Sequence, residues 1–182
     1  YKQTVLGVLW VILQPVLTTV VLTVLFSTFA NFQTGAIPYP LFALSGVLVW
    51  FFVNSSINSA SNSLLSNQSL VTKVYFPRLI MPVSAVLANL LDFVLGFFVL
   101  IGLMLYYGAA PTRSIVFVPV FIVLGILLAL SFGMLSAALN VRFRDVKFAL
   151  PFALQLWMFV SPVFYPPGIL SEKGKYLLSL NP

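Results

Sequence analysis

The stretch from Leu41 to Leu70, LFALSGVLVWFFVNSSINSASNSLLSNQSL, joins a strongly apolar half to a half rich in serine and asparagine. Its apolar part, Leu41–Val53, has about 13 residues, whereas a helix needs about 20 to cross a bilayer. Its polar half carries no Lys, Glu or Asp, whereas a soluble loop of similar polarity would usually contain some of these residues. The stretch therefore predicts a membrane helix that continues into its polar half. Those side chains should face protein or water, because hydrocarbon would make each buried amide costly.

The composition of the whole chain also indicates a membrane protein. Of its 182 residues, 61% are hydrophobic and 7% are charged, whereas soluble domains average about 25% charged residues. No acidic or basic side chain occurs between Lys2 and Lys73. We therefore predict an all-α polytopic membrane protein. The net charge of +6 fits basic loops on one side of a membrane, and nucleic acid is not an expected partner.

Five spans are expected within a single domain, at residues 5–29, 41–62, 79–107, 114–139 and 148–164. A cytoplasmic N-terminus places most of the basic residues inside, as the positive-inside rule requires. Those inside are Lys2, Lys73, Arg78, Arg142, Arg144 and Lys147, and those outside are Arg113, Lys173 and Lys175. Because the chain opens at Tyr1 and has an odd number of spans, we expect a sequence truncated at both ends, with one further span.

The residue types present argue against covalent chemistry. The chain has no Cys and no His, so thiolate nucleophiles, imidazole bases and the common zinc ligands are excluded. The only acids are Asp92, Asp145 and Glu172. The segment GILSEKGKY fails as a phosphate loop, because Gly168 and Gly174 are one residue too far apart and Tyr176 replaces Ser or Thr. We expect no enzyme activity, no metal and no cofactor in this chain, and any ATP must bind to a partner.

Two features inside the predicted spans have alternative explanations. Asp92 lies in the third span between Ala88 and Gly96, where it serves either as a structural hydrogen-bonding group toward another helix or as a proton relay. The fourth span carries small residues at every fourth position, which favours close helix packing either within one subunit or between subunits. These small residues are Gly125, Ala129, Gly133 and Ala137.

Aromatic side chains crowd the fifth span and its end. Phe152 and Phe159 are accompanied by Phe148, Phe164 and Tyr165. Aromatic faces stack on the C–H faces of sugars, so these rings could form a wall along which a glycan slides. The same rings would equally suit contact with lipid or anchoring at the membrane interface. An uncharged polar second span beside such rings favours a bulky polar cargo over an ion.

Five segments taken together resemble the ABC-2 type permeases that export polysaccharides, including the O-antigen, capsule and teichoic-acid exporters. The similarity covers essentially the whole chain, in order. The segments are YKQTVLGVLWVILQP, LFALSGVLVWFF, LVTKVYFPRLIMP, NVRFRDVKFALPF and SPVFYPPG. The resemblance implies six spans and an amphipathic N-terminal interface helix, in a homodimer of the bacterial cytoplasmic (inner) membrane. It also implies a separate cytoplasmic ATPase subunit that binds ATP and Mg, and a lipid-linked glycan as cargo.

The resemblance also implies roles for particular residues. A cytoplasmic coupling helix for the ATPase would include Lys73, Val74, Tyr75, Phe76, Pro77 and Arg78. The translocation path would include Asn54, Ser55, Asn58, Ser59, Asn62, Phe152 and Phe159. A re-entrant extracytoplasmic gate would include Ser161, Pro162, Phe164, Tyr165 and Pro166. The cytoplasmic loop comprises Arg142, Arg144, Asp145 and Lys147.

Other interpretations of these residues stay open. Lys73 and Arg78 would equally anchor a helix at anionic headgroups. The basic residues of the cytoplasmic loop would serve as topology determinants, and Arg144 could pair with Asp145. At the level of the whole chain, the same architecture would suit an exporter of a drug or a lipid. A membrane enzyme acting on lipid-linked sugars is the remaining alternative, against which the scarcity of acids and the lack of His argue.

Overall fold

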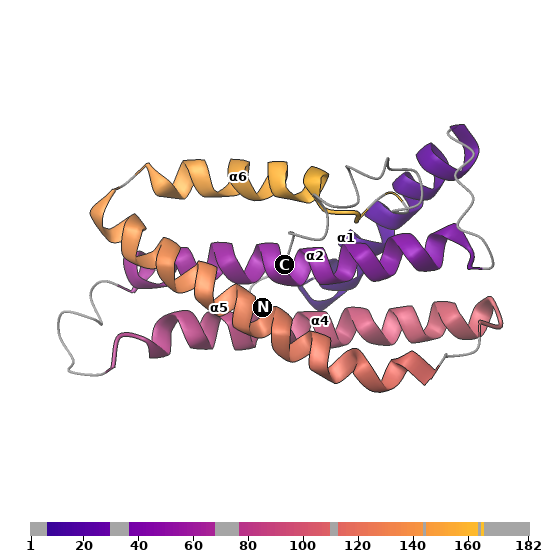
Figure 1. The fold of residues 1–182 in the computed structure, drawn as a ribbon, viewed down its shortest axis with the longest axis horizontal. Coiled ribbons are helices and arrows are strands. Elements are labelled where there is room, and N and C mark those ends of the chain that lie inside the picture. The colour runs from indigo at the N-terminus through magenta and orange to yellow at the C-terminus, as the bar shows by residue number, and fades with distance from the viewer. Residues whose placement is uncertain are drawn as a thin grey trace. The chain divides into compact units, whose positions relative to one another are not determined.

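The computed structural model describes residues 7–29, 37–67, 77–109, 113–143, 145–163 and 165. Helices make up nearly all of this part of the chain, which contains no strand (Figure 1). The all-α class predicted from the sequence is therefore confirmed. In order, the elements are α1 (Gly7–Leu22), the π-helical η1 (Thr23–Phe29), α2 (Tyr39–Ser66), α4 (Ile80–Tyr106), the 3-10 helix η2 (Arg113–Phe117), α5 (Val118–Arg142) and α6 (Val146–Val160).

Four of the helical stretches are long and apolar enough to cross a membrane. They are Leu9–Phe26, Tyr39–Ser66, Ile80–Tyr106 and Ile115–Arg142. The remaining helix, α6, has 15 residues. At a rise of 1.5 Å per residue it is about 22 Å long, which is less than the roughly 30 Å of a bilayer's hydrocarbon core. That the segment around α6 crosses the membrane therefore stays a prediction.

The ends of α2 and α4 follow from local sequence. In α2, Pro40 lies in the first turn, where a missing N–H costs nothing. Pro82 occupies the same kind of position in α4, so the helix begins before it and is not broken there. Gly108, with φ of 63°, ends α4 in a Schellman turn. In that turn the N–H of Ala109 donates to the carbonyl of Met104 at 3.0 Å, and the N–H of Gly108 donates to that of Leu105 at 3.2 Å.

The chain divides into two compact units, and the boundaries fall inside α2, α4, η2 and α6. The first draws on Tyr1–Phe51, Asp92–Arg113 and Met158–Pro182, and the second on Phe52–Leu91 and Ser114–Trp157. Buried residues are concentrated in α2. In its most apolar stretch of 18 residues 56% are buried, whereas in the corresponding stretch of each other candidate span at most 11% are. In the first unit α2 and α4 approach closely at Gly96, where an added Cβ would overlap the Cδ2 of Leu48.

The second unit is built on the contact between α2 and α5. Ala129 and Ala137 are buried, and Gly133 between them packs on Ala60 of α2. A Cβ added at Gly133 would lie 2.7 Å from the Cβ of Ala60. The stripe of small residues in α5 is therefore used for packing within one chain. Of the two explanations left open by the sequence, contact within the subunit is the one that the structure supports.

Candidate functional site

The polar half of α2 presents a face of uncharged side chains. Ser55, Ser59 and Asn62 are exposed, and Asn54 and Asn58 are half-buried. Their spacing of three to four residues places them on one side of the helix. We call these five residues the α2 polar stripe. They are the part of the predicted translocation path that lies in the second span, and the structure brings them together on one surface.

The asparagines of the α2 polar stripe form a ladder along the helix. The amide of Asn58 donates to the side-chain oxygen of Asn54 at 2.6 Å and to its carbonyl at 3.0 Å. The amide of Asn62 donates to the carbonyl of Asn58 at 3.0 Å. Ser66 continues the pattern with a hydroxyl bond of 2.9 Å to the carbonyl of Asn62. The amides thus have partners within α2, and the surface that they form carries dipoles but no charge.

One residue that the sequence analysis did not single out joins α5 to this surface. Asn140, fully buried in α5, donates from Nδ2 to the carbonyl of Ser61 at 3.1 Å and to Oδ1 of Asn62 at 3.2 Å. It lies one turn beyond Ala137 and two turns beyond Gly133, on the same buried face of the helix. An asparagine at the end of a stripe of small residues is the signal that could have identified it.

Further buried polar groups accompany Asn140 on this side of α2. The hydroxyls of Ser56 and Ser61 are buried, and neither they nor Oδ1 of Asn140 has a hydrogen-bond partner within the described residues. A buried polar atom without a partner costs about 1–3 kcal/mol unless water satisfies it. Serines therefore occupy both sides of α2: those at 55 and 59 face outward, whereas these two line the contact with α5.

The aromatic residues predicted for the path lie on α6. Phe152 is 63% exposed and Phe159 is 59% exposed. A third ring of this helix, Trp157, packs instead on Phe132 of α5, with ring centroids 5.3 Å apart. Leu154 is the buried residue of α6. The two predicted rings are thus accessible to a cargo or to lipid, and both interpretations stay open.

The segment predicted as a gate turns back at the end of α6. The hydroxyl of Tyr165 donates to the carbonyls of Phe159 and Val160 at 3.4 and 3.3 Å, which satisfies acceptors that a helix end leaves free. Val163 packs against α2, because a Cβ added at Gly46 would lie 2.8 Å from its carbonyl oxygen. Ser161 is buried and Pro162 is half-buried, whereas the predicted gate residues Phe164 and Pro166 lie outside the described residues. A gating role stays a prediction.

Most of the predicted coupling segment lies outside the described residues. This applies to Lys73, Val74, Tyr75 and Phe76, and also to Arg144 of the cytoplasmic loop. Pro77 and Arg78 are described and exposed, in the turn that leads into α4. Contact of these two residues with a partner or with headgroups is therefore sterically open. The coupling role itself stays a prediction.

The described part of the cytoplasmic loop links α5 to α6 with charges that match the helix dipoles. Arg142 lies in the last turn of α5, and its guanidinium stands 5.3 Å from the ring centroid of Phe143. Asp145 immediately precedes α6, where a negative charge is favourable. The ammonium of Lys147 stands 4.7 Å from the ring centroid of Phe148. The role of these charged residues as topology determinants stays a prediction.

Comparison with known proteins shows the family to which this chain belongs. The sequence profile of the ABC-2 type transporters matches residues 1–182, the whole chain. The chain belongs to the ABC-2 type transporter family. The resemblance read from the five sequence segments is thereby confirmed. As an ABC-2 type chain it is a multi-pass membrane protein and a transport subunit rather than an enzyme, and the family implies an ATPase partner.

Several curated relatives of this ABC-2 type chain are named for the export or transport of polysaccharides. The O-antigen export system permease protein RfbA of Myxococcus xanthus is 33% identical over 185 residues, covering 100% of this chain and 70% of the relative. The Klebsiella pneumoniae protein of the same name is 27% identical over 184 residues, with the same coverage. The polysialic acid transport protein KpsM of Escherichia coli is 25% identical over 179 residues, covering 95% of this chain and 68% of the relative.

Proposed function

We propose that the chain is the membrane subunit of an ATP-driven exporter that moves a lipid-linked polysaccharide out of the bacterial cytoplasm. Two copies would form a conduit across the cytoplasmic membrane, each with its N-terminus inside and each docked on an ATPase subunit. The curated relatives named for O-antigen export and for polysialic acid transport support the cargo class. The family supports the ATPase partner.

The α2 polar stripe is the observation that carries this proposal. A glycan presents many hydroxyls and must bind weakly enough to keep moving. Exchanging one hydrogen bond for another changes the free energy by only about 0.5–1.5 kcal/mol, so a row of amides and hydroxyls would guide a glycan without trapping it. A charged group would hold an ionic cargo more strongly, and no acidic or basic residue occurs between Lys2 and Lys73. The stripe is therefore suited to a neutral, hydroxyl-rich cargo.

The proposal also gives roles to segments outside the α2 polar stripe. Lys73–Arg78 would receive the movement of the ATPase when it closes on ATP and Mg, and the exposed turn at Pro77 and Arg78 is sterically open to such a partner. The exposed rings of Phe152 and Phe159 would provide stacking faces for sugars. The turn from Ser161 to Tyr165 would begin the extracytoplasmic gate. None of these segments requires covalent chemistry.

Cysteine labelling tests the conduit directly, because the chain contains no native Cys. Ser55→Cys and Ser59→Cys are introduced singly into the full-length subunit with its ATPase, and a membrane-impermeant maleimide is added in each nucleotide state. Ser56→Cys and Ser61→Cys are matched controls, since they make the same change at buried positions of the same helix. We expect labelling at the first pair, with reduced export after labelling, and protection of the second pair. Protection of Ser55 and Ser59 in every state would contradict the conduit.

The cargo class has its own test, which does not depend on the conduit. Deleting the gene should abolish surface display of the polysaccharide, and the full-length subunit supplied with its ATPase should restore it. Unchanged display after deletion would exclude the exporter function. Restoration by the ATPase subunit alone would exclude this chain as the membrane subunit.

A further inference from the structure

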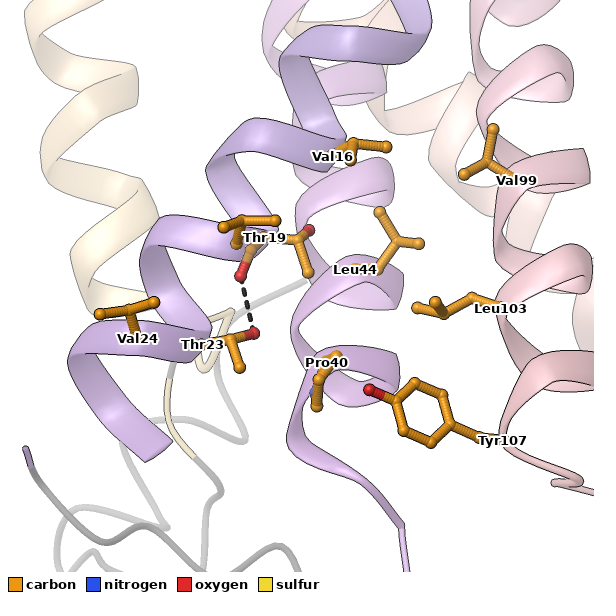
Figure 2. Close-up of a pocket in the computed structure, with 10 residues that line it drawn as sticks. Val16, Thr19, Thr23, Val24, Pro40, Leu44, Val99, Leu103 and Tyr107 are labelled. Atoms are coloured by element: carbon orange, nitrogen blue, oxygen red, sulfur yellow. Dashed lines mark hydrogen bonds between the residues drawn. The ribbon is translucent and has the colours of Figure 1, made fainter. Parts of the chain in front are cut away.

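The first unit contains a cavity that plays no part in the proposed path. It has a volume of about 340 Å³ and lies between α1 with η1, α2 and α4 (Figure 2). Val16 and Val24 line it from the first helical stretch, Leu44 from α2, and Val99 and Leu103 from α4. Figure 2 shows Val16, Leu44, Val99 and Leu103 around one common space. No residue of the α2 polar stripe is part of the lining.

The lining offers an almost purely apolar surface. Its two threonines use their hydroxyl protons within the helix: Thr19 donates to the carbonyl of Pro15 at 2.8 Å, and Thr23 donates to that of Thr19 at 2.7 Å (Figure 2). A ligand would therefore meet mainly their methyl groups and the neighbouring aliphatic side chains. A polar ligand would lose its hydration in this cavity without a compensating set of hydrogen bonds.

The dimensions of the cavity match a single hydrocarbon chain. Its lining runs from Val16 to Val24 along the first helical stretch, and from Val99 in α4 to Tyr107 directly after that helix. At 1.5 Å per residue each run is about 12 Å long, which is close to the roughly 15 Å depth of one leaflet's hydrocarbon. An engineered cavity of about 150 Å³ holds one benzene, so this one has room for on the order of a dozen carbon atoms.

One end of the cavity lies at the helix ends, and Tyr107 marks it. Tyr107 directly follows α4, and Pro40 lies in the first turn of α2, so both residues are at the loop end of their helices. Figure 2 shows the Tyr107 ring reaching toward Pro40. Tyrosine at the end of a membrane helix favours the level of the lipid headgroups. A chain that enters beside Tyr107 would therefore start at the headgroups and run inward toward Val16 and Val99.

The outer surface of α1 and η1 is apolar. Leu17, Val21 and Leu25 are all about half exposed, and only 11% of the candidate span Leu9–Phe26 is buried. Such a surface is more favourable beside hydrocarbon than beside water, because transfer of apolar area out of water is favourable. Acyl chains are therefore the most abundant apolar molecules beside the cavity. We propose that the cavity binds one acyl chain of a membrane phospholipid, with its headgroup near Tyr107.

The test uses a phosphatidylethanolamine that carries a diazirine midway along one acyl chain. The full-length protein with its ATPase is reconstituted with this lipid and irradiated, and the adducts are mapped by peptide mass spectrometry. We expect adducts on lining residues such as Val99 and Leu103. Val99→Phe should fill the cavity and reduce these adducts several-fold. Val94→Phe is the matched control, because it makes the same change on the same helix at a residue that is 42% exposed and outside the lining.

Several outcomes would overturn the proposal. Absence of adducts on the lining of the wild-type protein would exclude a resident acyl chain, whatever the variants do. Equal labelling in Val99→Phe and Val94→Phe would show that the cavity is not the binding site. If Val99→Phe does not fold, as judged by gel filtration, Val16→Phe replaces it. A photoreactive polyprenyl phosphate that labels the lining and displaces the phospholipid would assign the cavity to the tail of a lipid carrier instead.

Discussion

The contact between Gly133 of α5 and Ala60 of α2 gives a sharp quantitative prediction. In Gly133→Ala the new Cβ would lie 2.7 Å from the Cβ of Ala60, whereas carbon atoms in contact prefer about 3.5–4.0 Å. The two helices would have to separate, and overpacking of this kind costs about 1–3 kcal/mol. Replacing Gly by Ala in a helix also gains about 1 kcal/mol of helix propensity, which must be subtracted. Gly102→Ala measures that gain alone, because a Cβ there meets nothing within 4 Å.

The free energies of unfolding are measured by titration with SDS in mixed micelles, with helix content followed by circular dichroism. We expect Gly133→Ala to be less stable than Gly102→Ala by about 1–3 kcal/mol. The double variant Gly133→Ala with Ala60→Gly moves the methyl group from α2 to α5, so it should recover most of this loss. Equal stability of Gly133→Ala and Gly102→Ala, or strictly additive effects in the double variant, would refute the packing described here.

Three further predictions concern other contacts. Asn140→Ala should lower the free energy of unfolding by about 1–2 kcal/mol in the same titration, because it removes two hydrogen bonds to α2. Gly46→Ala should displace the turn after α6, since its Cβ would lie 2.8 Å from the Val163 carbonyl oxygen; the expected cost in unfolding free energy is about 1–3 kcal/mol. Reversing the charges of Lys73 and Arg78 to Glu should lower export and cargo-stimulated ATPase activity several-fold while membrane insertion, measured by fractionation, stays unchanged.

Each of these predictions has a control on the same chain. Asn89→Ala is matched to the Asn140 variant, because Asn89 donates to the carbonyl of Ala85 in its own helix at 2.8 Å; an equal loss in both variants would mean that the bonds to α2 contribute nothing. Gly102→Ala serves again beside Gly46→Ala, which must be the less stable of the two. Arg113→Glu controls for charge in general. If export survives reversal at both predicted coupling residues, the coupling segment lies elsewhere.

The helices were the most predictable part of this protein. Runs of apolar residues without charge identify membrane helices because the bilayer requires both length and apolarity. The shortness of Leu41–Val53 also predicted that its helix continues into polar sequence, and α2 does so as far as Ser66. Local chemistry was less informative about helix ends. Pro82 is a residue type that often breaks a helix, yet it lies in the first turn of α4, where proline has no cost.

The candidate site was predictable in composition but not in orientation. Ser55 and Ser56 are adjacent and identical in chemistry, yet one is exposed and the other buried. Helical periodicity predicts that their side chains point in different directions. Only the packing of α5 against α2 determines which of the two is buried. Asn140 illustrates the same limit, because its acceptors lie 78 and 79 residues away on another helix. The register between two helices depends on the fit of many side chains at once, which no local pattern records.

The asparagines of α2 and α5 differ in where their hydrogen-bond acceptors lie, and this difference matters during membrane insertion. The amides of Asn58 and Asn62 donate to carbonyls of their own helix. Both amides can therefore be hydrogen-bonded as soon as α2 forms during insertion. Asn140 depends on acceptors that α2 supplies, and α2 is made before α5. The order of translation thus presents the acceptors before the donor emerges. In a circular permutation that placed α5 ahead of α2, the Asn140 amide would enter the translocon before its acceptors were made.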